Sequence, residues 1–206
     1  MARKVVEEKQ EARREEIIDA CEKLYKTMSF KAITMKEISL ETSFTRPSVY
    51  NYFHTKEEIF LALLQREYAR WGEDLKGSRD VDLSVAGFAG LLAGTLAKRE
   101  CLLKLLSMNH FEMEENSRLE RLTDFKVTFG MIINCLKSKI DRYFPAMSAG
   151  ERDAFLYAFL PFMFGIYPYT HVTEKQLAAM SAADTPFILH STYEMIYNFI
   201  IKTLRG

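Results

Sequence analysis

Apolar residues recur along this chain mainly at spacings of three and four, the period of an α-helix with one buried face. No segment shows the alternation of apolar and polar residues that is typical of a strand. We therefore expect an all-α protein. The first stripe predicts a helix from near Gln10 to near Ser29, built on Ile17, Ile18, Cys21, Leu24, Tyr25 and Met28. Further helices are predicted near residues 82–98, 101–111, 116–143, 149–168 and 185–204.

Short polar motifs mark helix starts in the N-terminal third. Thr34-Met-Lys-Glu37 and Thr55-Lys-Glu-Glu58 follow the capping-box pattern, in which a hydroxyl and a carboxylate satisfy each other's backbone amides. Thr45 can cap another helix, with Pro47 in the first turn, where amides lack intrahelical partners. The sequence thus predicts two short helices joined by a tight connection, followed by a long one.

A change in pattern divides the chain into two parts. The long helix after Thr55 fades between Gly72 and Asp80, where Gly77-Ser-Arg-Asp80 predicts a turn. We expect an N-terminal domain over residues 1–60, a connecting helix over 56–74 and a larger helical domain over 80–206. Within the larger domain, Ser148-Ala-Gly-Glu151 and Thr185-Pro186 are the expected starts of the last two long helices.

Composition places the chain among globular proteins, with 48% hydrophobic and 27% charged residues. No apolar run reaches the roughly 18 residues of a membrane span, and Met1–Gln10 lacks the apolar stretch of a secretory signal. Cys21, Cys101 and Cys135 are far apart and lie among apolar residues, which is typical of buried thiols in a reducing compartment. We therefore expect a cytoplasmic protein without membrane contact.

The net charge of zero hides a basic window. Between Lys23 and Lys56 there are six basic residues against Glu37 and Glu41, a local charge of +4. The acidic stretch from Glu7 to Glu22 cancels it in the total. A local basic surface on a neutral protein is compatible with binding to phosphates.

The segment from Thr45 to Ile59 is the most informative part of the chain. If Thr45 caps a short helix, Val49 and Phe53 face inward and the polar and tyrosine side chains between them face outward. Such side chains suit a DNA groove, because arginine pairs with guanine edges, asparagine with adenine, and tyrosine hydroxyls reach phosphates. The amides that begin the next helix, with Lys56, offer another phosphate site. On geometry alone, an ordinary solvated helical hairpin remains an alternative.

The residues themselves resemble a known family. Thr34-x-x-x-Ile38, then Tyr50-x-Tyr52-Phe53-x-x-Lys56-Glu57-x-Ile59, after an amphipathic first helix, is similar to the DNA-binding domain of tetracycline-repressor-like (TetR) bacterial regulators. The chain departs from that pattern at Ser29 and at the Thr42-Ser43-Phe44 turn, where the family often has glycine. A left-handed turn without glycine would cost roughly 1–2 kcal/mol.

The resemblance implies roles for individual residues. Thr34 and Lys36 would contact phosphates, Arg46, Pro47, Ser48 and Asn51 would face the major groove, and Tyr50, Tyr52 and Lys56 would hold the DNA backbone, with His54 and Thr45 beside them. It also implies a homodimer through the last two long helices, a palindromic double-stranded DNA operator and a small-molecule effector. The expected function is that of a ligand-responsive transcriptional regulator, most simply a repressor.

The C-terminal half is where an effector would bind. Its candidate pocket residues are apolar or aromatic: Phe88, Leu92, Met108, Phe111, Met131, Cys135, Phe159, Met163 and Tyr167. Such a lining predicts an apolar or aromatic ligand. Each of these residues can equally be plain core packing, because methionines and aromatic residues at helical spacing commonly build cores.

Catalytic and metal-binding patterns are absent from the sequence. The histidines show no ligand spacing, the cysteines no zinc-finger spacing, and there is no glycine-rich phosphate loop or nucleophile turn. We expect no cofactor, no metal and no enzymatic activity. Two alternatives remain open: a helical small-molecule-binding protein or enzyme whose N-terminal hairpin is purely structural, and a regulator that senses oxidation through a cysteine.

Overall fold

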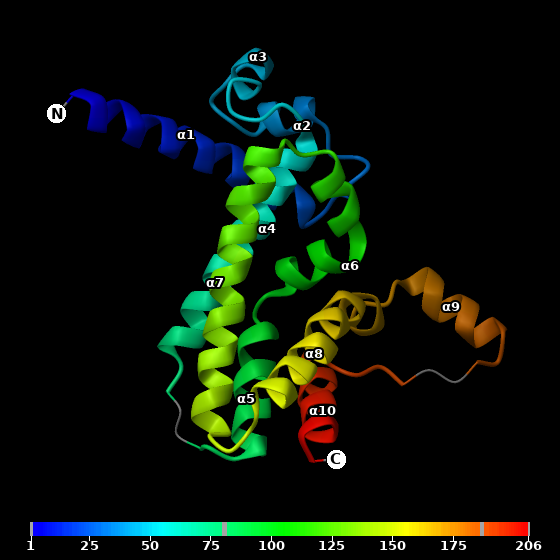
Figure 1. The fold of residues 1–206 in the computed structure, drawn as a ribbon. Helices are drawn as coiled ribbons and strands as arrows, with labels where there is room; N and C mark the ends of the chain where they lie inside the picture. The colour runs from blue at the N-terminus through cyan, green and yellow to red at the C-terminus, as the bar shows by residue number, and fades with distance from the viewer. Residues whose placement is uncertain (1, 80–81, 186–187, 206) are drawn as a thin grey trace. The chain divides into compact units, whose positions relative to one another are not determined.

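The computed structural model describes residues 2–79, 82–185 and 188–205, and within these the chain is helical without strands (Figure 1). The predicted all-α class is confirmed. The helices are α1 (Ala2–Tyr25), α2 (Met35–Leu40), α3 (Arg46–Val49), α4 (Lys56–Gly77), α5 (Val85–Leu96), α6 (Glu100–Glu115), α7 (Leu119–Tyr143), α8 (Ala149–Thr170), α9 (Glu174–Ala182) and α10 (Thr192–Arg205). None of these described helices is both long and apolar enough to span a membrane.

The chain forms two compact units. Unit 1 comprises residues 1–66 and 109–129, and unit 2 comprises residues 67–108 and 130–206. Helices α4, α6 and α7 each contribute to both units. In space, a segment from the middle of the chain, residues 109–129, therefore belongs with the N-terminal helices.

Local capping chemistry sets several helix starts as expected. The Thr34 hydroxyl accepts a hydrogen bond from the Lys36 amide at the start of α2. Ser148 and Glu151 form a complete capping box at the start of α8. Thr173 and Gln176 do the same for α9, a helix that the apolar pattern does not reveal. Caps of this kind typically stabilise a helix by about 1 kcal/mol each.

The last helix begins later than predicted. Thr185 precedes it by several residues, Pro186 and Phe187 lie outside the described residues, and α10 begins at Thr192. Ser191 and Glu194 cap it: the Ser191 hydroxyl accepts from the Glu194 amide at 3.2 Å, and the Glu194 carboxylate accepts from the Ser191 amide at 2.8 Å. The capping box at Ser191, rather than the Thr-Pro pair, thus determines the start of α10.

The core of unit 1 is aromatic and aliphatic. Val49 and Phe53 have no exposed surface, as the helical spacing predicts. The Phe60 ring on α4 packs against the rings of Tyr25 and Phe30, with centroids 5.1 and 4.6 Å away. Burial of each such side chain contributes about 1.5–3 kcal/mol to folding. This core fixes the short helices α2 and α3, which are too short to be stable alone.

Unit 2 has a separate core that includes the only tryptophan of the chain, Trp71. The Phe88 ring on α5 contacts the rings of Tyr143, Phe144 and Phe155 at centroid distances of 5.2, 5.3 and 5.8 Å. α10 packs along α5 and against α8. Helix α8 continues past both of its internal prolines. One face of this apolar helix packs on the core, and the other remains exposed.

Candidate DNA-binding surface and effector groove

The turn between α2 and α3 needs no glycine. Among the described residues the only non-glycine with positive φ is Asp184, so Thr42, Ser43 and Phe44 avoid the left-handed conformation and its cost. The Ser43 amide donates to the Glu16 carboxylate on α1 at 2.6 Å, and the Thr42 hydroxyl donates to the Ser39 carbonyl at 3.0 Å. These bonds hold the connection without a special residue.

Helix α3 is short, but its hydrogen bonding extends beyond its last residue. α3 ends at Val49, and the amides of Tyr52 and Phe53 then donate to the Val49 carbonyl at 3.0 and 3.1 Å. The Thr45 hydroxyl lies 3.0 Å from the Ser48 hydroxyl and forms no cap bond to the helix backbone. The buried Val49 and Phe53 therefore anchor a single turn that presents its other side chains outward.

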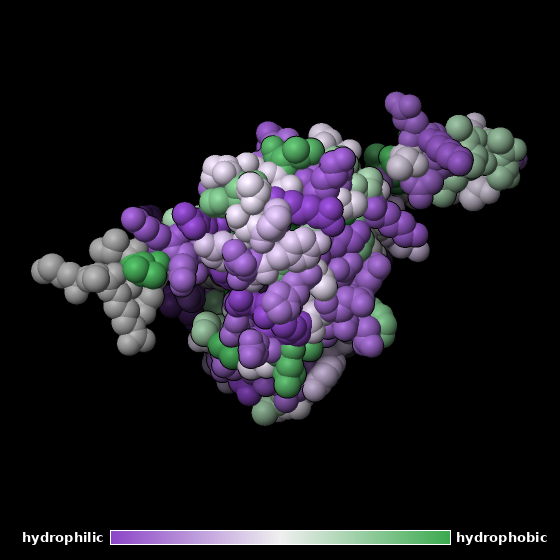
Figure 2. Space-filling model, turned by 90° about the horizontal axis from the view of Figure 1, so that it is seen from above, coloured by the Kyte–Doolittle hydropathy of each residue, from purple (hydrophilic) through white to green (hydrophobic). Residues whose placement is uncertain are grey.

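The outward side chains are mostly those predicted to contact DNA. Exposed among them are Thr34, Lys36, Thr45, Arg46, Pro47, Tyr50, Asn51 and His54, whereas Ser48, Tyr52 and Lys56 are half-buried. Arg46 donates to the Tyr50 hydroxyl at 3.3 Å and lies over the Tyr50 ring at 5.9 Å. The structure thus brings these residues into unit 1. The space-filling view shows a largely hydrophilic face with scattered apolar side chains (Figure 2).

Lys56 has a different environment from the one the sequence suggests. Its ammonium donates to the Phe30 carbonyl at 2.8 Å and lies 4.2 Å from the centre of the Phe30 ring. The side chain therefore ties the start of α4 to the loop after α1. A contact with a DNA phosphate, which the resemblance implies, would compete with these interactions.

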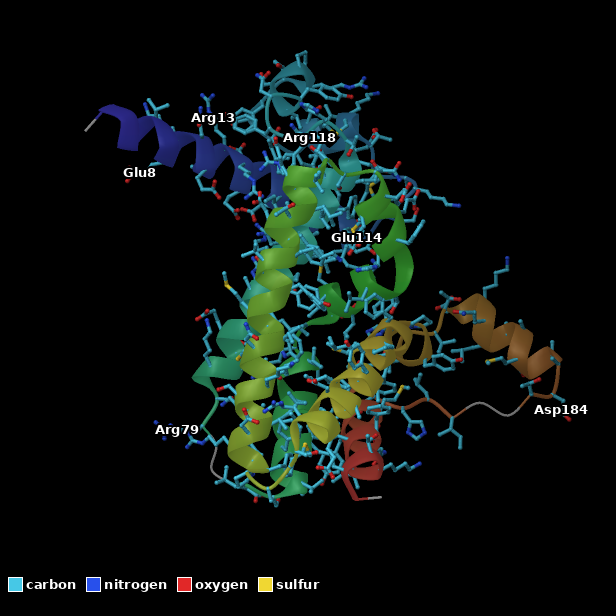
Figure 3. The ribbon with its side chains drawn as sticks, viewed as in Figure 1. Glu8, Arg13, Arg79, Glu114, Arg118 and Asp184 are labelled. Atoms are coloured by element: carbon cyan, nitrogen blue, oxygen red, sulfur yellow. The ribbon has the colours of Figure 1, made fainter. Side chains whose placement is uncertain are left out.

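Arg118, which the sequence did not single out, joins the end of segment 45–59 to the junction between α6 and α7. We call residues 45–59 the reading segment, because it is the segment predicted to read DNA. We call residues 116–121 the junction. Glu58 in α4 has a fully buried side chain and accepts from the Arg118 guanidinium through Nε at 2.6 Å and through Nη2 at 3.0 Å. The Arg118 amide and the His54 amide also donate to this carboxylate, at 3.2 and 2.8 Å. Arg118 immediately precedes α7 (Figure 3).

The Thr55–Glu58 motif therefore functions only partly as a capping box. The Thr55 hydroxyl does accept from the Glu58 amide at 3.2 Å. The Glu58 carboxylate, however, binds the His54 amide and Arg118 instead of the Thr55 amide. Burial by itself raises the pKa of Glu58, but the hydrogen bonds from Arg118 and from the His54 amide outweigh it, and the pKa is lowered. Glu58 is therefore an ionised, fully hydrogen-bonded buried carboxylate.

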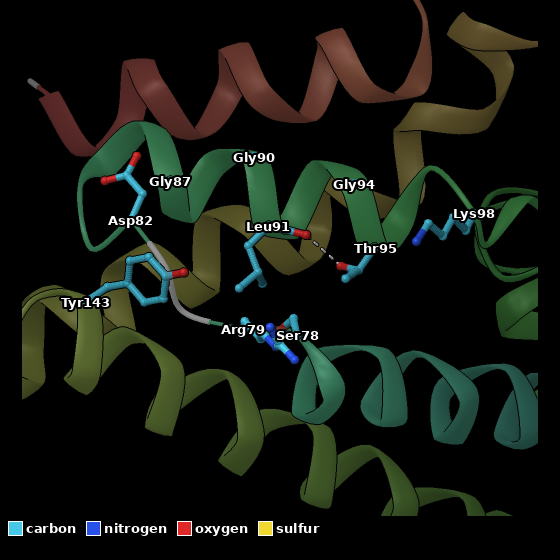
Figure 4. Close-up of a pocket in the computed structure, with 10 residues that line it drawn as sticks. All are labelled: Ser78, Arg79, Asp82, Gly87, Gly90, Leu91, Gly94, Thr95, Lys98 and Tyr143. Atoms are coloured by element: carbon cyan, nitrogen blue, oxygen red, sulfur yellow. Dashed lines mark hydrogen bonds between the residues drawn. The ribbon is translucent and has the colours of Figure 1, made fainter.

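Unit 2 contains a groove of about 380 Å³, a volume in the range of small-molecule sites (Figure 4). Its lining residues are Ser78, Arg79, Asp82, Gly87, Gly90, Leu91, Gly94, Thr95, Lys98 and Tyr143. The glycines recur on one side of α5, opposite the face that carries Phe88 and Leu92. A side chain at Gly94 would meet no atom within 4 Å, so this part of the helix surface is open.

The predicted pocket residues lie elsewhere, and none of them lines this groove. Phe88, Leu92, Phe159 and Met163 have no exposed surface and belong to the core. Phe111 and Met131 are 78% and 62% exposed. Tyr167 is half-buried and stacks on His171, with ring centroids 4.3 Å apart. Cys135 is half-buried, and the side chain of Met108 lies outside the described residues. The glycine spacing on α5 is the sequence signal that could have indicated the groove.

All three cysteines are at least partly buried. Cys21 is buried, and Cys101 and Cys135 are half-buried. Burial raises the pKa of the Cys135 thiol, which disfavours the reactive thiolate. Among the residues that the structure describes, no group of three or more histidine, cysteine or acidic side chains is arranged to hold a metal ion.

Comparisons with known proteins match both halves of the chain. Residues 17–63 match the model of bacterial regulatory proteins of the tetR family, and residues 65–204 match the tetracyclin repressor-like C-terminal domain. A relative named as an uncharacterized HTH-type transcriptional regulator, YfiR of Bacillus subtilis, is 35% identical over 65 residues, which is 32% of this chain and 32% of that protein. The match therefore spans about a third of each protein.

Solved structures show the same fold. A possible TetR family regulator from Streptomyces coelicolor A3(2) aligns with a TM-score of 0.62 and 13% identity, covering 93% of this chain and 98% of that one. A second TetR-family regulator from Streptomyces coelicolor aligns with a TM-score of 0.54 and 18% identity, covering 94% and 98%. A TetR regulator from Rhodococcus sp. RHA1 gives 0.53 at 13% identity, covering 93% and 97%. The chain therefore belongs to the TetR family of bacterial regulators, which are DNA-binding transcription factors and not enzymes.

Proposed function

We propose that this protein is a homodimeric repressor that reads a palindromic operator through α3 and the turn after it, and that a small-molecule effector releases it. TetR-family proteins bind operator DNA and small-molecule effectors and usually dimerise. The observation that supports the proposal best is the set of exposed polar side chains around Arg46 and Asn51, held by the fully buried Val49 and Phe53. In the proposed complex, Arg46, Pro47, Ser48 and Asn51 face base edges.

Phosphate contacts would position the protein without specifying sequence. Exposed Thr34 and Lys36 on the α2 side, and Thr45, Tyr50, Tyr52 and His54 on the α3 side, are the proposed contacts. Lys56 is the least favourable candidate, because its ammonium already binds the Phe30 carbonyl. Lys36 is therefore the better residue for testing the electrostatic part of binding.

The exposed face of α8 supports a dimer through the last two long helices. From Ala154 to Thr170 this helix has no charged residue, and its exposed positions are small, proline or tyrosine side chains. Tyr157 and Tyr169 are 81% and 62% exposed. An uncharged stripe with small residues allows the close approach of another helix, and a large exposed apolar surface is typical of an interaction site. Two subunits would place their reading helices about 34–36 Å apart.

The groove on α5 is the proposed effector site. Its floor of glycines and Leu91, with Tyr143 at one side, suits a flat apolar body, while Arg79, Lys98 and Thr95 offer polar contacts. This differs from the purely apolar lining that the sequence suggested, and an effector that also has a polar group fits it better. A ligand there would favour one arrangement of the dimer, and a small rotation can separate the reading helices from successive grooves.

DNA binding can be tested by fluorescence anisotropy. The unaltered protein should select a palindromic duplex from a random-sequence pool and bind it in a salt-dependent manner. Arg46→Ala and Asn51→Ala should each weaken discrimination at one base position by about 1–3 kcal/mol. Lys36→Ala should weaken binding to all sequences and lower the slope of log K against log salt by about one. Unchanged selectivity in both Arg46→Ala and Asn51→Ala would contradict the assignment of the reading helix.

The effector site can be tested with 1-anilinonaphthalene-8-sulfonate, a flat apolar probe with a charged group. Its fluorescence should rise on binding to the unaltered protein and not to Gly94→Leu, in which the new side chain fills the groove. Gly150→Leu is a matched control, because a side chain there also meets no atom within 4 Å and Gly150 does not line the groove. Equal probe binding by both variants would place the ligand elsewhere.

A further inference from the structure

Glu58 lies at the point where the reading segment ends and the long helix α4 begins. Only a few residues separate it from Asn51, and its carboxylate accepts from the His54 amide, which follows Phe53 directly. All partners of this carboxylate lie in unit 1. The arrangement therefore belongs to the body that carries the proposed DNA contacts, although Arg118 is 60 residues away in sequence.

The carboxylate of Glu58 is fully occupied. Oε1 accepts from the Arg118 amide and from Arg118 Nε, and Oε2 accepts from the His54 amide and from Arg118 Nη2. Paired N–H donors from an arginine fork hold a carboxylate in one orientation, unlike a single contact from a flexible lysine. The Glu58 side chain is fully buried while that of Arg118 is 37% exposed, so Arg118 lies between the carboxylate and solvent.

Two further hydrogen bonds run between the same two segments. The Thr55 hydroxyl donates to the Asn116 carbonyl at 3.1 Å. Arg121 Nη2 donates to the Tyr52 carbonyl at 3.5 Å, a longer and weaker bond. The junction therefore bonds directly to Tyr52, Thr55 and Glu58, and it holds His54 indirectly, because the His54 amide donates to the Glu58 carboxylate. These bonds act together with the buried Phe53 and with the Lys56 contact to Phe30.

We propose that Glu58 and Arg118 are positioning residues for DNA reading, which hold the exit of α3 against the junction so that Arg46 and Asn51 reach base edges in the correct orientation. The inference rests on the proposed function of α3. Hydrogen bonds to base edges lose strength within fractions of an ångström and about 30° of misalignment, so a small shift of this single-turn helix weakens all of them. Neither Glu58 nor Arg118 needs to touch DNA for this effect.

A set of variants separates positioning from folding and from direct contact. Arg118→Met removes the fork, Arg118→Lys retains only the charge, and the double variant Glu58→Gln/Arg118→Met leaves no unpaired buried charge. Lys126→Met is the matched control: it removes a cation from α7, the helix that Arg118 immediately precedes, and Lys126 pairs with Glu114 instead of with the α3 exit. Each protein is titrated, as the full chain, with the duplex that the unaltered protein selects from a random pool, at several salt concentrations.

Arg118→Met should weaken DNA binding tenfold or more without changing the salt slope, Arg118→Lys should weaken it less, and Lys126→Met should change it less than twofold. The double variant should melt at a temperature close to that of the unaltered protein and still bind weakly. Hydrogen exchange at the His54 amide should become faster in the double variant. These results together would support a positioning role.

Other outcomes would overturn the proposal. A folded double variant that binds as tightly as the unaltered protein would show that the pair does not position α3. A salt slope lowered by about one in Arg118→Met would show that Arg118 contacts a phosphate directly. If the unaltered protein shows no salt-dependent, sequence-selective binding, the proposed function fails, and the positioning role fails with it.

Discussion

Replacement of Thr95 by valine tests one buried hydrogen bond in unit 2. Trp71 has no exposed surface, and its indole Nε1 donates to the Thr95 hydroxyl at 3.1 Å. The same hydroxyl lies 3.0 Å from the Leu91 carbonyl, to which it can donate its own proton. Valine has nearly the same shape but no acceptor, so the indole N–H would remain buried without a partner.

The expected cost follows from that unpaired donor. Leaving a buried polar group without a partner costs about 1–3 kcal/mol. For a chain of this length, each kcal/mol lowers the melting temperature by about 2–4 °C, so Thr95→Val should lower it by several degrees. Urea unfolding followed by tryptophan emission is a direct assay, because Trp71 is the only tryptophan and lies in unit 2. The midpoint should fall with an unchanged slope.

A double-mutant cycle separates the hydrogen bond from packing. In a Trp71→Phe background, followed by circular dichroism, Thr95→Val should cost about 1 kcal/mol less than in the unaltered protein, because no indole donor is left unpaired. Thr95→Ser retains the hydroxyl and serves as a control that loses only a methyl group. An equal cost of Thr95→Val in both backgrounds would refute the reasoning and assign the effect to packing.

Three further outcomes are expected. Lys56→Met should lower stability by about 1 kcal/mol and weaken DNA binding without lowering the salt slope, since its ammonium binds the Phe30 carbonyl; a slope lowered by one would instead indicate a phosphate contact. Gly87→Ala should destabilise unit 2 by about 1–3 kcal/mol, because the new Cβ would lie 2.0 Å from the Asp82 backbone oxygen; unchanged tryptophan-detected unfolding would contradict this. Stability should fall as the solution is acidified below the ordinary carboxyl pKa of 4.5, because a hydrogen bond from Thr34 lowers the pKa of Glu37 and one from Ser148 lowers that of Glu151.

The sign of the pH effect follows from proton linkage. A carboxyl whose pKa is lower in the folded state binds fewer protons there than in the unfolded chain, so its stabilising effect is complete above pH 4.5 and is lost as the pH falls through the folded pKa. Glu37→Gln and Glu151→Gln should each flatten the acid dependence of the melting temperature. If both variants showed the same acid profile as the unaltered protein, these caps would not contribute to the pH dependence of stability.

Local sequence predicted much of the N-terminal fold correctly, because caps and periodicity act within a few residues. The Thr34 cap and the buried Val49 and Phe53 appear as expected. The prediction was wrong for the start of α10. The sequence pattern placed it at the Thr185-Pro186 pair, whereas the capping box that begins at Ser191 sets it in the structure. It also missed α9, whose weak apolar pattern reflects a helix without buried residues.

The candidate sites differ in how well sequence could reveal them. The outward positions of Arg46 and Asn51 could be predicted from one segment, because the residues that determine them lie within one or two helical turns. The groove on α5 was not predicted, because bulky apolar side chains were the expected lining, while the open surface arises from glycines such as Gly94. Large apolar residues such as Phe159 and Met163 fill the core instead, since burial of their surface stabilises the fold.

By itself, the sequence determined the helical class, most helix starts and the segment that is proposed to read DNA, because these depend on short-range spacing and on motifs within a few residues. Only the tertiary structure decided the partners of the charged groups. Glu58 is buried against Arg118 from the junction, and Lys56 binds the Phe30 carbonyl instead of remaining free for DNA. The physical reason is that burial and ion pairing depend on which distant helices pack together, and no local pattern records that choice.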